Sequence, residues 1–354
     1  MLKAKLSICI PTYNRAQYLP ELLDSIVEQA PTDGSVEICI SDNASIDNTR
    51  EIIESYKVAF PYIVYHANRE NLGADKNYLK CVAIASGEYC WLMGSDDKLV
   101  EQAISKIFYY IEKEQADILI CSRSPWFYGQ YISDQEAFCI GASHLYRISD
   151  DDDFLKYCES ATGLGALFSY LSSIIFRRAI WIESGIETFV GTAYVHVAIL
   201  FKAINSQKIS LYYVAESLIL CRMLNDSFLE SGDTLKRICL DFNYCRLINI
   251  FDSQSKKNAV LEVLARAAKP AFKIWRLLMY IPKSTEDTIR TLLKYCDEHL
   301  QFVGFARRIR CALLIAKRKI FAPFLFSLQQ GRRIYRIYIR PLKKGKLISH
   351  KMRG

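Results

Sequence analysis

In Tyr89-Cys90-Trp91-Leu92-Met93-Gly94-Ser95-Asp96-Asp97, a short apolar run stops abruptly at two adjacent carboxylates. A run of this length that ends in turn-type residues predicts a buried strand whose carboxyl end opens into a loop. Open α/β sheets bind their ligands at such ends. Two neighbouring carboxylates repel each other unless a cation lies between them, and hard divalent ions take oxygen ligands. Alternatively, Asp96 or Asp97 is the N-cap of a helix predicted from about Lys98 to Glu114.

Length and composition bound the class of protein. With 354 residues, 51% of them apolar, the chain can bury a full core and form one large domain plus an appendage. It contains no run of about eighteen uncharged apolar residues and no charged-then-apolar leader, so we expect neither a membrane-spanning nor a secreted protein. The 12 cysteines lie in apolar runs without C-x-x-C pairs, which indicates buried thiols in a reducing cytoplasm.

The charge of the chain is unevenly distributed. The formal net charge is +8, yet no Asp or Glu follows Glu298, and residues 307–354 carry 15 of the 46 Lys and Arg. The remaining 31 basic residues face 38 acidic ones, so the body of the chain is acidic. An acidic body with a basic end predicts a polyanionic partner, either an anionic membrane surface or a nucleic acid.

Three further strands are predicted before the acidic pair, at Leu6–Ile10, Val36–Ile40 and Ile63–His66. Each ends in a polar loop and is followed by apolar residues at helical spacing. Repeated strand, loop and helix predict a mainly parallel sheet covered by helices on both faces. The four loops then meet at one sheet edge, which favours a ligand site there. Gly-x-Gly-x-x-Gly and P-loop motifs are absent, so hydride transfer on a dinucleotide and P-loop phosphoryl transfer lose support.

Four motifs of the chain stand in a recognisable order: Ile10–Asn14, Ser41–Thr49, Asn71–Gly73 and Gly94–Asp97. They resemble the signatures of family 2 glycosyltransferases, and the match covers about the first 120 residues. Three later stretches are similar to abequosyltransferases of O-antigen assembly: Ser169–Ser173, Gly191–His196 and Cys221–Phe228. The resemblance implies an α/β domain of the GT-A fold, with a Rossmann-like sheet, that binds a nucleotide-diphosphate sugar.

Nucleotide-sugar transfer needs a pocket for the nucleobase, a cation for the diphosphate and a base for the acceptor hydroxyl. By the resemblance, the nucleotide-sugar contacts are Pro11, Tyr13, Arg15, Asp42, Asn43, Gly73, Lys76, Asp96 and Arg222. Asp42 would accept a hydrogen bond from the base edge, although an Asx-turn that caps the next helix also explains it. Core packing also explains Tyr13, and a solvated face also explains Arg15, Lys76 and Asn77.

Asp96 and Asp97 correspond to the metal-binding aspartates of the family, so the resemblance implies Mn²⁺ or Mg²⁺ as cofactor. The commoner family pattern is Asp-x-Asp-Asp, whereas Gly94 stands at the first acidic position of this chain. A single carboxylate, for which we favour Asp97, would then hold the ion together with diphosphate oxygens. Such an ion binds weakly without nucleotide.

His196 stands where the family has its catalytic aspartate, within the apolar, helically spaced segment Thr192–Leu200. An imidazole can accept the proton of the acceptor hydroxyl as a carboxylate can. A core histidine with satisfied hydrogen bonds is an equally good explanation. The substitution leaves open whether the reaction inverts or retains the anomeric configuration.

Two other polar stretches have simpler explanations beside the functional ones. The acids of Ser149–Asp153 precede a helical pattern, so we interpret them as an N-cap and first turn rather than a metal cage. Arg222, Asn225, Asp226 and Ser227 follow the apolar strand Leu211–Leu220. A loop there could close over the diphosphate or hold the acceptor, or it could be an ordinary surface turn.

The chain is predicted to have three parts: a GT-A catalytic domain (1–230), a helical extension (231–304) and a basic amphipathic tail (305–354). In the tail, cations interleave with aliphatic and aromatic residues, as in segments that lie on anionic membranes. A solvated helical tail that packs on the catalytic domain is the alternative. We therefore expect a cytoplasmic enzyme, peripheral at the inner face of the plasma membrane.

The leading hypothesis is a metal-dependent transferase that moves a hexose onto a polyprenyl diphosphate-linked oligosaccharide in O-antigen biosynthesis. The favoured donor is a 3,6-dideoxyhexose such as abequose, carried by CDP, and a UDP-, GDP- or dTDP-sugar is the alternative. A non-catalytic membrane- or nucleic-acid-binding module is the alternative of another class. Binding of single-stranded nucleic acid would need stacking aromatics in a basic groove of the body, which is acidic, so no nucleic-acid partner is expected.

Overall fold

A computed structural model describes residues 4–127, 130–131, 138, 141–222, 236–268, 287–288, 290–291 and 294. The chain divides into two compact units, one of residues 1–226 with 240–267 and one of residues 227–239 with 268–354. Nearly all of the described residues belong to the first unit. The predicted basic tail, 305–354, lies outside the described residues, so its membrane-binding character stays a prediction.

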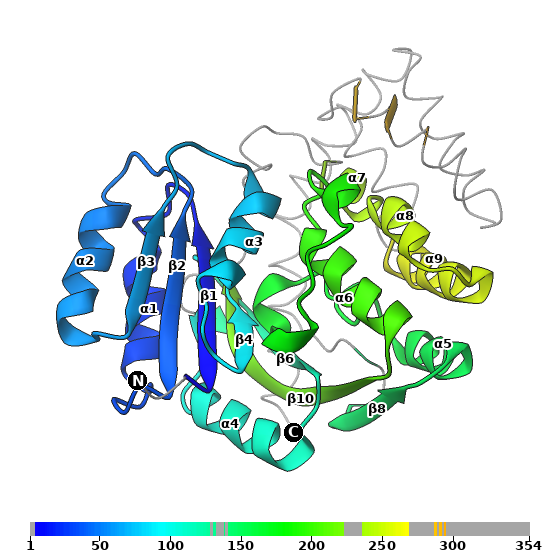
Figure 1. The fold of residues 1–354 in the computed structure, drawn as a ribbon, viewed down its shortest axis with the longest axis horizontal. Helices are drawn as coiled ribbons and strands as arrows, with labels where there is room; N and C mark the ends of the chain where they lie inside the picture. The colour runs from blue at the N-terminus through cyan, green and yellow to red at the C-terminus, as the bar shows by residue number, and fades with distance from the viewer. Residues whose placement is uncertain are drawn as a thin grey trace, which may run out of the picture. The chain divides into compact units, whose positions relative to one another are not determined.

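A ten-stranded mixed sheet forms the centre of the first unit (Figure 1). Its strands are β1 (Leu6–Thr12), β2 (Val36–Asp42), β3 (Ile63–Ala67), β4 (Tyr89–Leu92), β5 (Lys98–Leu99), β6 (Ile118–Phe127), β7 (Gln130–Tyr131), β8 (His144–Ile148), β9 (Ile174–Arg177) and β10 (Ile209–Arg222). Their order is β3-β2-β1-β4-β9-β6-β10-β5, with β7 beside β6 and β8 beside β10. The predicted parallel sheet is confirmed for β1 to β4. Strand β9 then enters antiparallel between β4 and β6.

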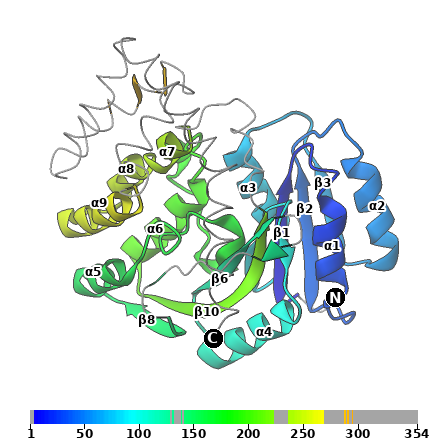
Figure 2. The ribbon, with the colours of Figure 1, turned by 180° about the vertical axis from the view of Figure 1, so that it is seen from behind.

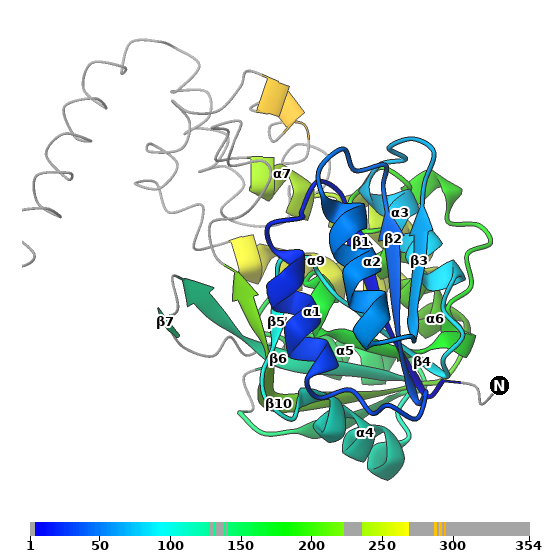
Figure 3. The same ribbon diagram turned by 90° about the vertical axis from the view of Figure 1, so that its left-hand side faces the viewer.

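Helices cover both faces of this sheet. They are α1 (Leu19–Val27), α2 (Thr49–Ala59), α3 (Ala74–Ala83), α4 (Ala103–Glu114), α5 (Asp151–Ser160), α6 (Val195–Ser206), α7 (Lys236–Asp241), α8 (Tyr244–Leu247) and α9 (Gln254–Ala268), with short 3₁₀ turns at Leu171–Ser173, Arg178–Ile180, Glu187–Phe189 and Ile248–Ile250. Helix α3 lies in front of the parallel strands in Figure 1 and α1 in front of them in Figure 2, whereas α1 and α2 lie side by side (Figure 3).

The side chains of β1 alternate between these two helical layers. Leu6, Ile8 and Ile10 belong to one buried apolar cluster with residues of α1 and α4. On the other face lies α3, whose Cys81 thiol donates to the carbonyl of Cys39 in the neighbouring strand β2 at 3.2 Å. Every described cysteine except Cys239 is buried, and all are free thiols, as the composition indicated. A strand buried on both faces requires the continuous apolar run that the sequence shows.

Strand register brings the polar loops to one edge of the sheet. Thr12, which ends β1, lies opposite Asp42, which ends β2. On the other side of β1, Cys9 lies opposite Leu92, and the Met93 N–H donates to the Cys9 carbonyl at 2.9 Å. The loops that follow β1, β2 and β4 therefore start beside one another, as the parallel arrangement predicted.

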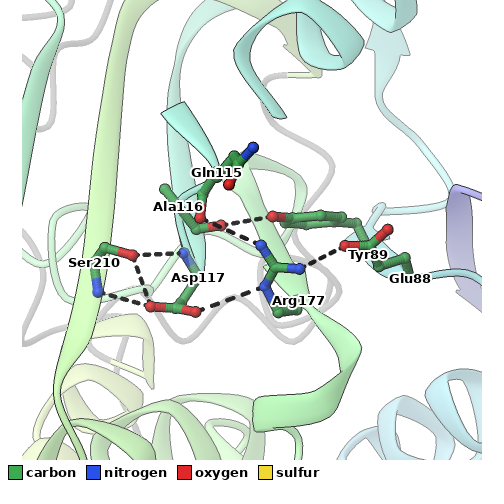
Figure 4. A network of polar contacts seen from close by, with 7 residues as sticks. All are labelled: Glu88, Tyr89, Gln115, Ala116, Asp117, Arg177 and Ser210. Atoms are coloured by element: carbon green, nitrogen blue, oxygen red, sulfur yellow. Dashed lines mark hydrogen bonds and ion pairs between the residues drawn. The ribbon is translucent and has the colours of Figure 1, made fainter. Parts of the chain in front are cut away.

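The opposite edge of the sheet is held by a polar network around Arg177, the last residue of β9 (Figure 4). Its guanidinium donates to Glu88 at 2.5 Å and to the Gln115 carbonyl at 3.3 Å, and it lies 3.7 Å from the Asp117 carboxylate. Asp117 in turn accepts from the Ser210 hydroxyl at 2.7 Å. These contacts fasten β4, β6, β9 and β10 to each other at the edge away from the candidate site.

Two local predictions about acidic residues have opposite outcomes. The helix predicted from about Lys98 begins only at Ala103, with Gln102 as its N-cap, because Lys98 and Leu99 form β5 against β10. The N-cap alternative for the acidic pair at 96 and 97 is therefore wrong. The N-cap at the start of α5 is confirmed, since the Asp150 carboxylate accepts from the Asp153 N–H at 2.9 Å.

Helices α8 and α9 lie in the range predicted as a helical extension, yet they belong to the first unit. Lys256 of α9 forms an ion pair with Asp151 of α5 at 3.1 Å, and Arg266 donates to the Cys158 carbonyl at 2.6 Å. The first unit therefore includes residues 240–267, and the predicted three-part division stays a prediction. Over the residues that the structure describes, no helix has the length and apolar character needed to span a membrane.

Candidate active site

The loops after β1 and β2 are joined into one rim by hydrogen bonds. The Asn14 N–H donates to the Ser45 hydroxyl at 2.8 Å, and its side-chain carbonyl accepts from the Ile46 N–H at 2.9 Å. Asn14 itself has a positive φ of 50°, a conformation that asparagine tolerates better than most residues. Pro11 is buried at the end of β1, whereas Tyr13 is 43% exposed on this rim. An exposed aromatic face beside a polar loop is available for stacking on a planar ring.

Asp42 stands at the carboxyl end of β2 with its side chain almost fully buried. One carboxylate oxygen accepts from the Ser45 N–H at 2.9 Å, which is the Asx-type turn that the sequence left as an alternative. The other oxygen accepts from the Tyr65 hydroxyl at 2.9 Å. Burial and this carboxylate raise the pKa of Tyr65. Each carboxylate oxygen has more than one lone pair, so these contacts still allow a hydrogen bond to a ligand.

Asn43, predicted as a nucleotide contact, is buried and holds the loop after β3. Its amide donates to Asn71 at 2.7 Å, and its carbonyl oxygen accepts from the Leu72 N–H at 2.9 Å. The geometry therefore indicates that Asn43 shapes the loop that presents Gly73 and Lys76, both of which are exposed. Asn77 is likewise buried and donates to the Ser41 carbonyl at 3.0 Å, so the solvated-face explanation is wrong for this residue.

In the acidic loop after β4, Asp97 is enclosed by protein donors. Its side chain is 6% exposed, and one oxygen accepts from the Tyr170 hydroxyl at 2.8 Å and from the Ser172 hydroxyl. The other oxygen accepts from the Arg222 N–H at 3.2 Å. Burial, followed by the charge of Asp96, raises the pKa of the Asp97 carboxyl to about 7. Asp97 is thus fixed in place and turned toward the protein.

Asp96 is the more exposed member of the pair. Its side chain is 26% exposed and lies 4.0 Å from the Arg15 guanidinium. The Arg222 guanidinium donates to the Asp96 carbonyl at 3.1 Å and forms an ion pair with Glu21. Arg15 and Arg222 both lie over the Tyr18 ring. Four of the predicted site residues, Arg15, Asp96, Asp97 and Arg222, are therefore brought together.

Several residues of this cluster were missed from the sequence as members of the site. Trp126 stacks on the Arg222 guanidinium at 4.5 Å, and the Arg123 guanidinium lies 4.1 Å from the centre of the Tyr170 ring. Tyr170 and Ser172 belong to one of the stretches similar to abequosyltransferases, which was the available signal. Arg123 and Trp126 carried no such signal, because only the pairing of β6 with β10 brings them here.

His196 lies in the core at 2% exposure, between the Tyr78 and Tyr194 rings. Its Nε2 is 3.0 Å from the Phe168 carbonyl, and since a carbonyl only accepts, Nε2 carries the proton. Nδ1 is buried and has no hydrogen-bond partner among the described residues. Burial lowers the pKa of His196 to about 4, against the opposing effect of the Phe168 bond. This geometry favours the core histidine over the catalytic base.

Asp75 caps the amino end of α6 from the first turn of α3. Its carboxylate accepts from the N–H groups of Gly191 at 2.7 Å, Ala193 at 3.0 Å and Val195 at 3.2 Å. Burial raises the pKa of Asp75, although these backbone bonds act in the opposite direction. A carboxylate at this position also complements the helix dipole. Asp75 therefore connects the loop after β3 to the segment that precedes His196.

The described residues of this site offer few ligands to a divalent cation. Within the described ranges, no group of three or more His, Cys, Asp or Glu side chains could hold a metal ion. Asp97 already accepts three hydrogen bonds, whereas Asp96 has a carboxylate that solvent reaches. The site therefore fits a cation for which a bound diphosphate supplies most oxygen ligands, an arrangement common for Mg²⁺.

Comparison with known sequences agrees with this arrangement. The profile of Glycosyl transferase family 2 matches residues 7–164. Abequosyltransferase RfbV from Salmonella typhimurium is 37% identical over 268 residues, which cover 74% of this chain and 80% of that protein. The chain belongs to glycosyl transferase family 2.

This family 2 glycosyltransferase also resembles solved structures. Residues 1–349 of Staphylococcus aureus TarS in complex with UDP superimpose with a TM-score of 0.61 at 17% identity, over 92% of each chain. The Pyrobaculum calidifontis mannosyltransferase PcManGT in complex with GDP-Man and Mn²⁺ has a TM-score of 0.50 at 15% identity, over 91% of this chain and 88% of that one. At these identities the likeness concerns the fold, and it confirms the GT-A fold of the first unit.

Proposed function

We propose that this family 2 glycosyltransferase moves a hexose from a nucleotide-diphosphate sugar onto a lipid-linked oligosaccharide during O-antigen or related cell-surface polysaccharide synthesis. The similarity to RfbV over most of both chains supports a 3,6-dideoxyhexose such as abequose, carried by CDP. The observation that carries the proposal is the meeting of the loops after β1, β2 and β4, which combine the exposed Tyr13, the buried Asp42 and the acidic pair at one sheet edge.

The nucleoside would bind on the rim made by the first two loops. Tyr13 offers an aromatic face for the base, beside the buried Pro11, and Asp42 offers a carboxylate for a base-edge donor. That carboxylate can accept from uracil N3–H or from the cytosine amine, so it does not select between them. Asn43 contributes by holding the third loop in place.

The diphosphate would bind between the basic residues of the same edge. Arg15 and Arg222 flank Asp96, and Lys76 with Gly73 opens the first turn of α3, whose amino end favours an anion. A divalent cation, Mn²⁺ or Mg²⁺, would be held by the Asp96 carboxylate and by diphosphate oxygens. When bound, such an ion neutralises charge on the leaving nucleoside diphosphate. We assign Asp97, which the sequence favoured as the ligand, to holding the loop, since its oxygens face protein donors.

For His196 we propose a structural role. Its Nε2–H holds the carbonyl of Phe168, a residue with the unusual φ of 67°, just before the stretch that contacts Asp97. A non-glycine residue with positive φ is strained, and such strain persists only where its surroundings hold it. His196 would thus help to fix the Ser169–Ser173 segment.

Calorimetric titration of CDP, UDP, GDP and dTDP tests the proposal, each with Mn²⁺ and with excess chelator. We expect one nucleotide to bind, and to bind more tightly with Mn²⁺, which would name the base of the donor. Transfer from the corresponding nucleotide sugar to a polyprenyl diphosphate-linked oligosaccharide, followed by mass spectrometry, then identifies the sugar. Absence of binding by all four nucleotides to folded protein would contradict the proposal.

The acceptor is proposed to be membrane-bound, and the basic residues of 305–354 to hold the enzyme at an anionic membrane surface on its cytoplasmic side. A chain that ends at residue 304 should lose sedimentation with vesicles containing phosphatidylglycerol and keep nucleotide binding. Loss of nucleotide binding together with vesicle binding would contradict this division of roles.

A further inference from the structure

The acidic loop of this chain has no room for a side chain at position 94. A Cβ built on Gly94 would lie 2.9 Å from an oxygen of Asp97 and 3.3 Å from an oxygen of Asp96 and from the Ser172 hydroxyl. Real Cβ atoms essentially never approach other atoms to 2.9 Å, and Asp97 and Ser172 are both buried and hydrogen-bonded to each other. The glycine at the first acidic position is therefore part of how this loop is packed.

Ser172 lies beside Gly94 and makes three hydrogen bonds, two with the acidic loop and one with β4. Its hydroxyl accepts from the Gly94 N–H at 2.8 Å and donates to the Asp97 carboxylate. Its carbonyl accepts from the Trp91 indole N–H at 2.8 Å, inside β4. Ser172 is 1% exposed and is separated from Asp97 by 75 residues, so these are tertiary contacts of a buried side chain.

Tyr170 completes the enclosure of Asp97. Its hydroxyl donates to the same carboxylate oxygen as Ser172, at 2.8 Å. Asp97 has no freedom to turn while both donors and the Arg222 N–H hold it. Its neighbour Asp96 then has a fixed backbone from which its carboxylate extends toward Arg15.

We propose that Ser172, assisted by Tyr170, is a positioning residue for the cation and diphosphate site. Ser172 fixes Gly94 and Asp97 and thereby sets the direction in which Asp96 presents its carboxylate. This inference rests on the proposed function and deepens it, since it gives the Ser169–Ser173 stretch a role in nucleotide binding that depends on the cation. Side chains that orient a metal ligand typically change metal affinity by 10- to 100-fold when removed.

The neighbouring Ser173 provides a matched control. It is buried like Ser172 and lies in the same 3₁₀ turn, but its hydroxyl has no hydrogen-bond partner among the described residues. Ser173→Ala therefore removes the same atoms from the same segment without breaking a contact to the acidic loop. Tyr170→Phe is a second, milder test, since it removes one donor to Asp97 and keeps the ring.

The experiment measures the affinity of the full chain for the nucleoside diphosphate that binds the wild type most tightly, with Mn²⁺ and with chelator. For Ser172→Ala we expect the Mn²⁺-dependent gain in affinity to fall at least tenfold while binding in chelator is unchanged. Tyr170→Phe should lose part of the gain, and Ser173→Ala should behave as the wild type. Thermal unfolding establishes that each variant is folded, and if Ser172→Ala is not, Tyr170→Phe decides.

Three results would overturn the inference in different ways. A full Mn²⁺-dependent gain in both Ser172→Ala and Tyr170→Phe would remove the positioning role and leave the proposed function intact. Absence of the gain in the wild type would contradict the cation site and, with it, any role of Ser172 in arranging that site. Equal loss in Ser173→Ala would show that the segment acts through its packing, which also overturns the assignment to Ser172.

Discussion

Replacement of His196 by glutamine distinguishes between two roles of this residue, a structural histidine of the core and a catalytic base. The glutamine Nε2 can donate to the Phe168 carbonyl as the imidazole does, but the side chain cannot take up a proton. In the wild type, burial lowers the pKa of His196 from 6.5 to about 4. The folded protein therefore binds this proton less well than the unfolded chain, and the wild type should lose stability as the pH falls through 6.5 toward 4.

The size of the effect follows from the two pKa values. At about 1.4 kcal/mol for each pKa unit, the full difference corresponds to about 3 kcal/mol of unfolding free energy. About 2 kcal/mol of it should be lost between pH 7.5 and 5, because the unfolded imidazole is by then largely protonated. His196→Gln has no imidazole at this position. Between pH 7.5 and 5, its unfolding free energy should therefore fall by about 2 kcal/mol less than that of the wild type.

Urea unfolding of both proteins between pH 7.5 and 5 measures the difference. His144→Gln, at an exposed position on β8, is the control and should follow the wild type across this range. If the unfolding free energies of the wild type and His196→Gln change with pH in parallel, the reasoning is refuted, because this would require an imidazole that solvent reaches. If the turnover of His196→Gln falls by more than about 100-fold without loss of stability, the catalytic-base hypothesis is restored.

Three further substitutions test the candidate site. Asp96→Asn should abolish the Mn²⁺-dependent gain in nucleotide affinity measured by calorimetry, with unchanged binding in chelator and an unfolding temperature close to that of the wild type. Asp42→Asn should weaken nucleotide binding by about tenfold with or without Mn²⁺, since it removes a charged hydrogen-bond acceptor for the base. Gly94→Asp recreates the commoner family pattern, yet it should lower both the transfer rate and the unfolding temperature, because its Cβ would lie 2.9 Å from Asp97. Higher transfer by Gly94→Asp would contradict the packing argument.

The sequence predicted those parts of the fold that depend on neighbouring residues. The strands β1 to β4, the helix N-cap at Asp150 and the meeting of the polar loops all follow from local patterns and the geometry of parallel strands. The insertion of β9 between β4 and β6 was not predicted, because strand order depends on pairing between segments that are distant in sequence.

The sequence predicted which residues belong to the candidate site, but it did not predict the direction in which their side chains point. The sequence favoured Asp97 as the metal ligand, whereas the hydroxyls of Tyr170 and Ser172 and the Arg222 N–H, all more than 70 residues away, hold Asp97 turned toward the protein. In the same way, the sequence predicted Asn43 as a ligand contact because it lies in a polar loop. In the structure, its side-chain amide is hydrogen-bonded to Asn71 and Leu72 of the loop after β3. Roles that depend on tertiary partners cannot be predicted from local spacing.

Anomalous diffraction at the manganese edge, from crystals grown with Mn²⁺ and the nucleoside diphosphate that binds, would locate the cation and the nucleotide together. We expect a single manganese ion bonded to the Asp96 carboxylate and to diphosphate oxygens, with the nucleobase beside Tyr13 and Asp42. Manganese bonded to Asp97 instead of Asp96, or a nucleotide bound away from the loops after β1, β2 and β4, would contradict this expectation.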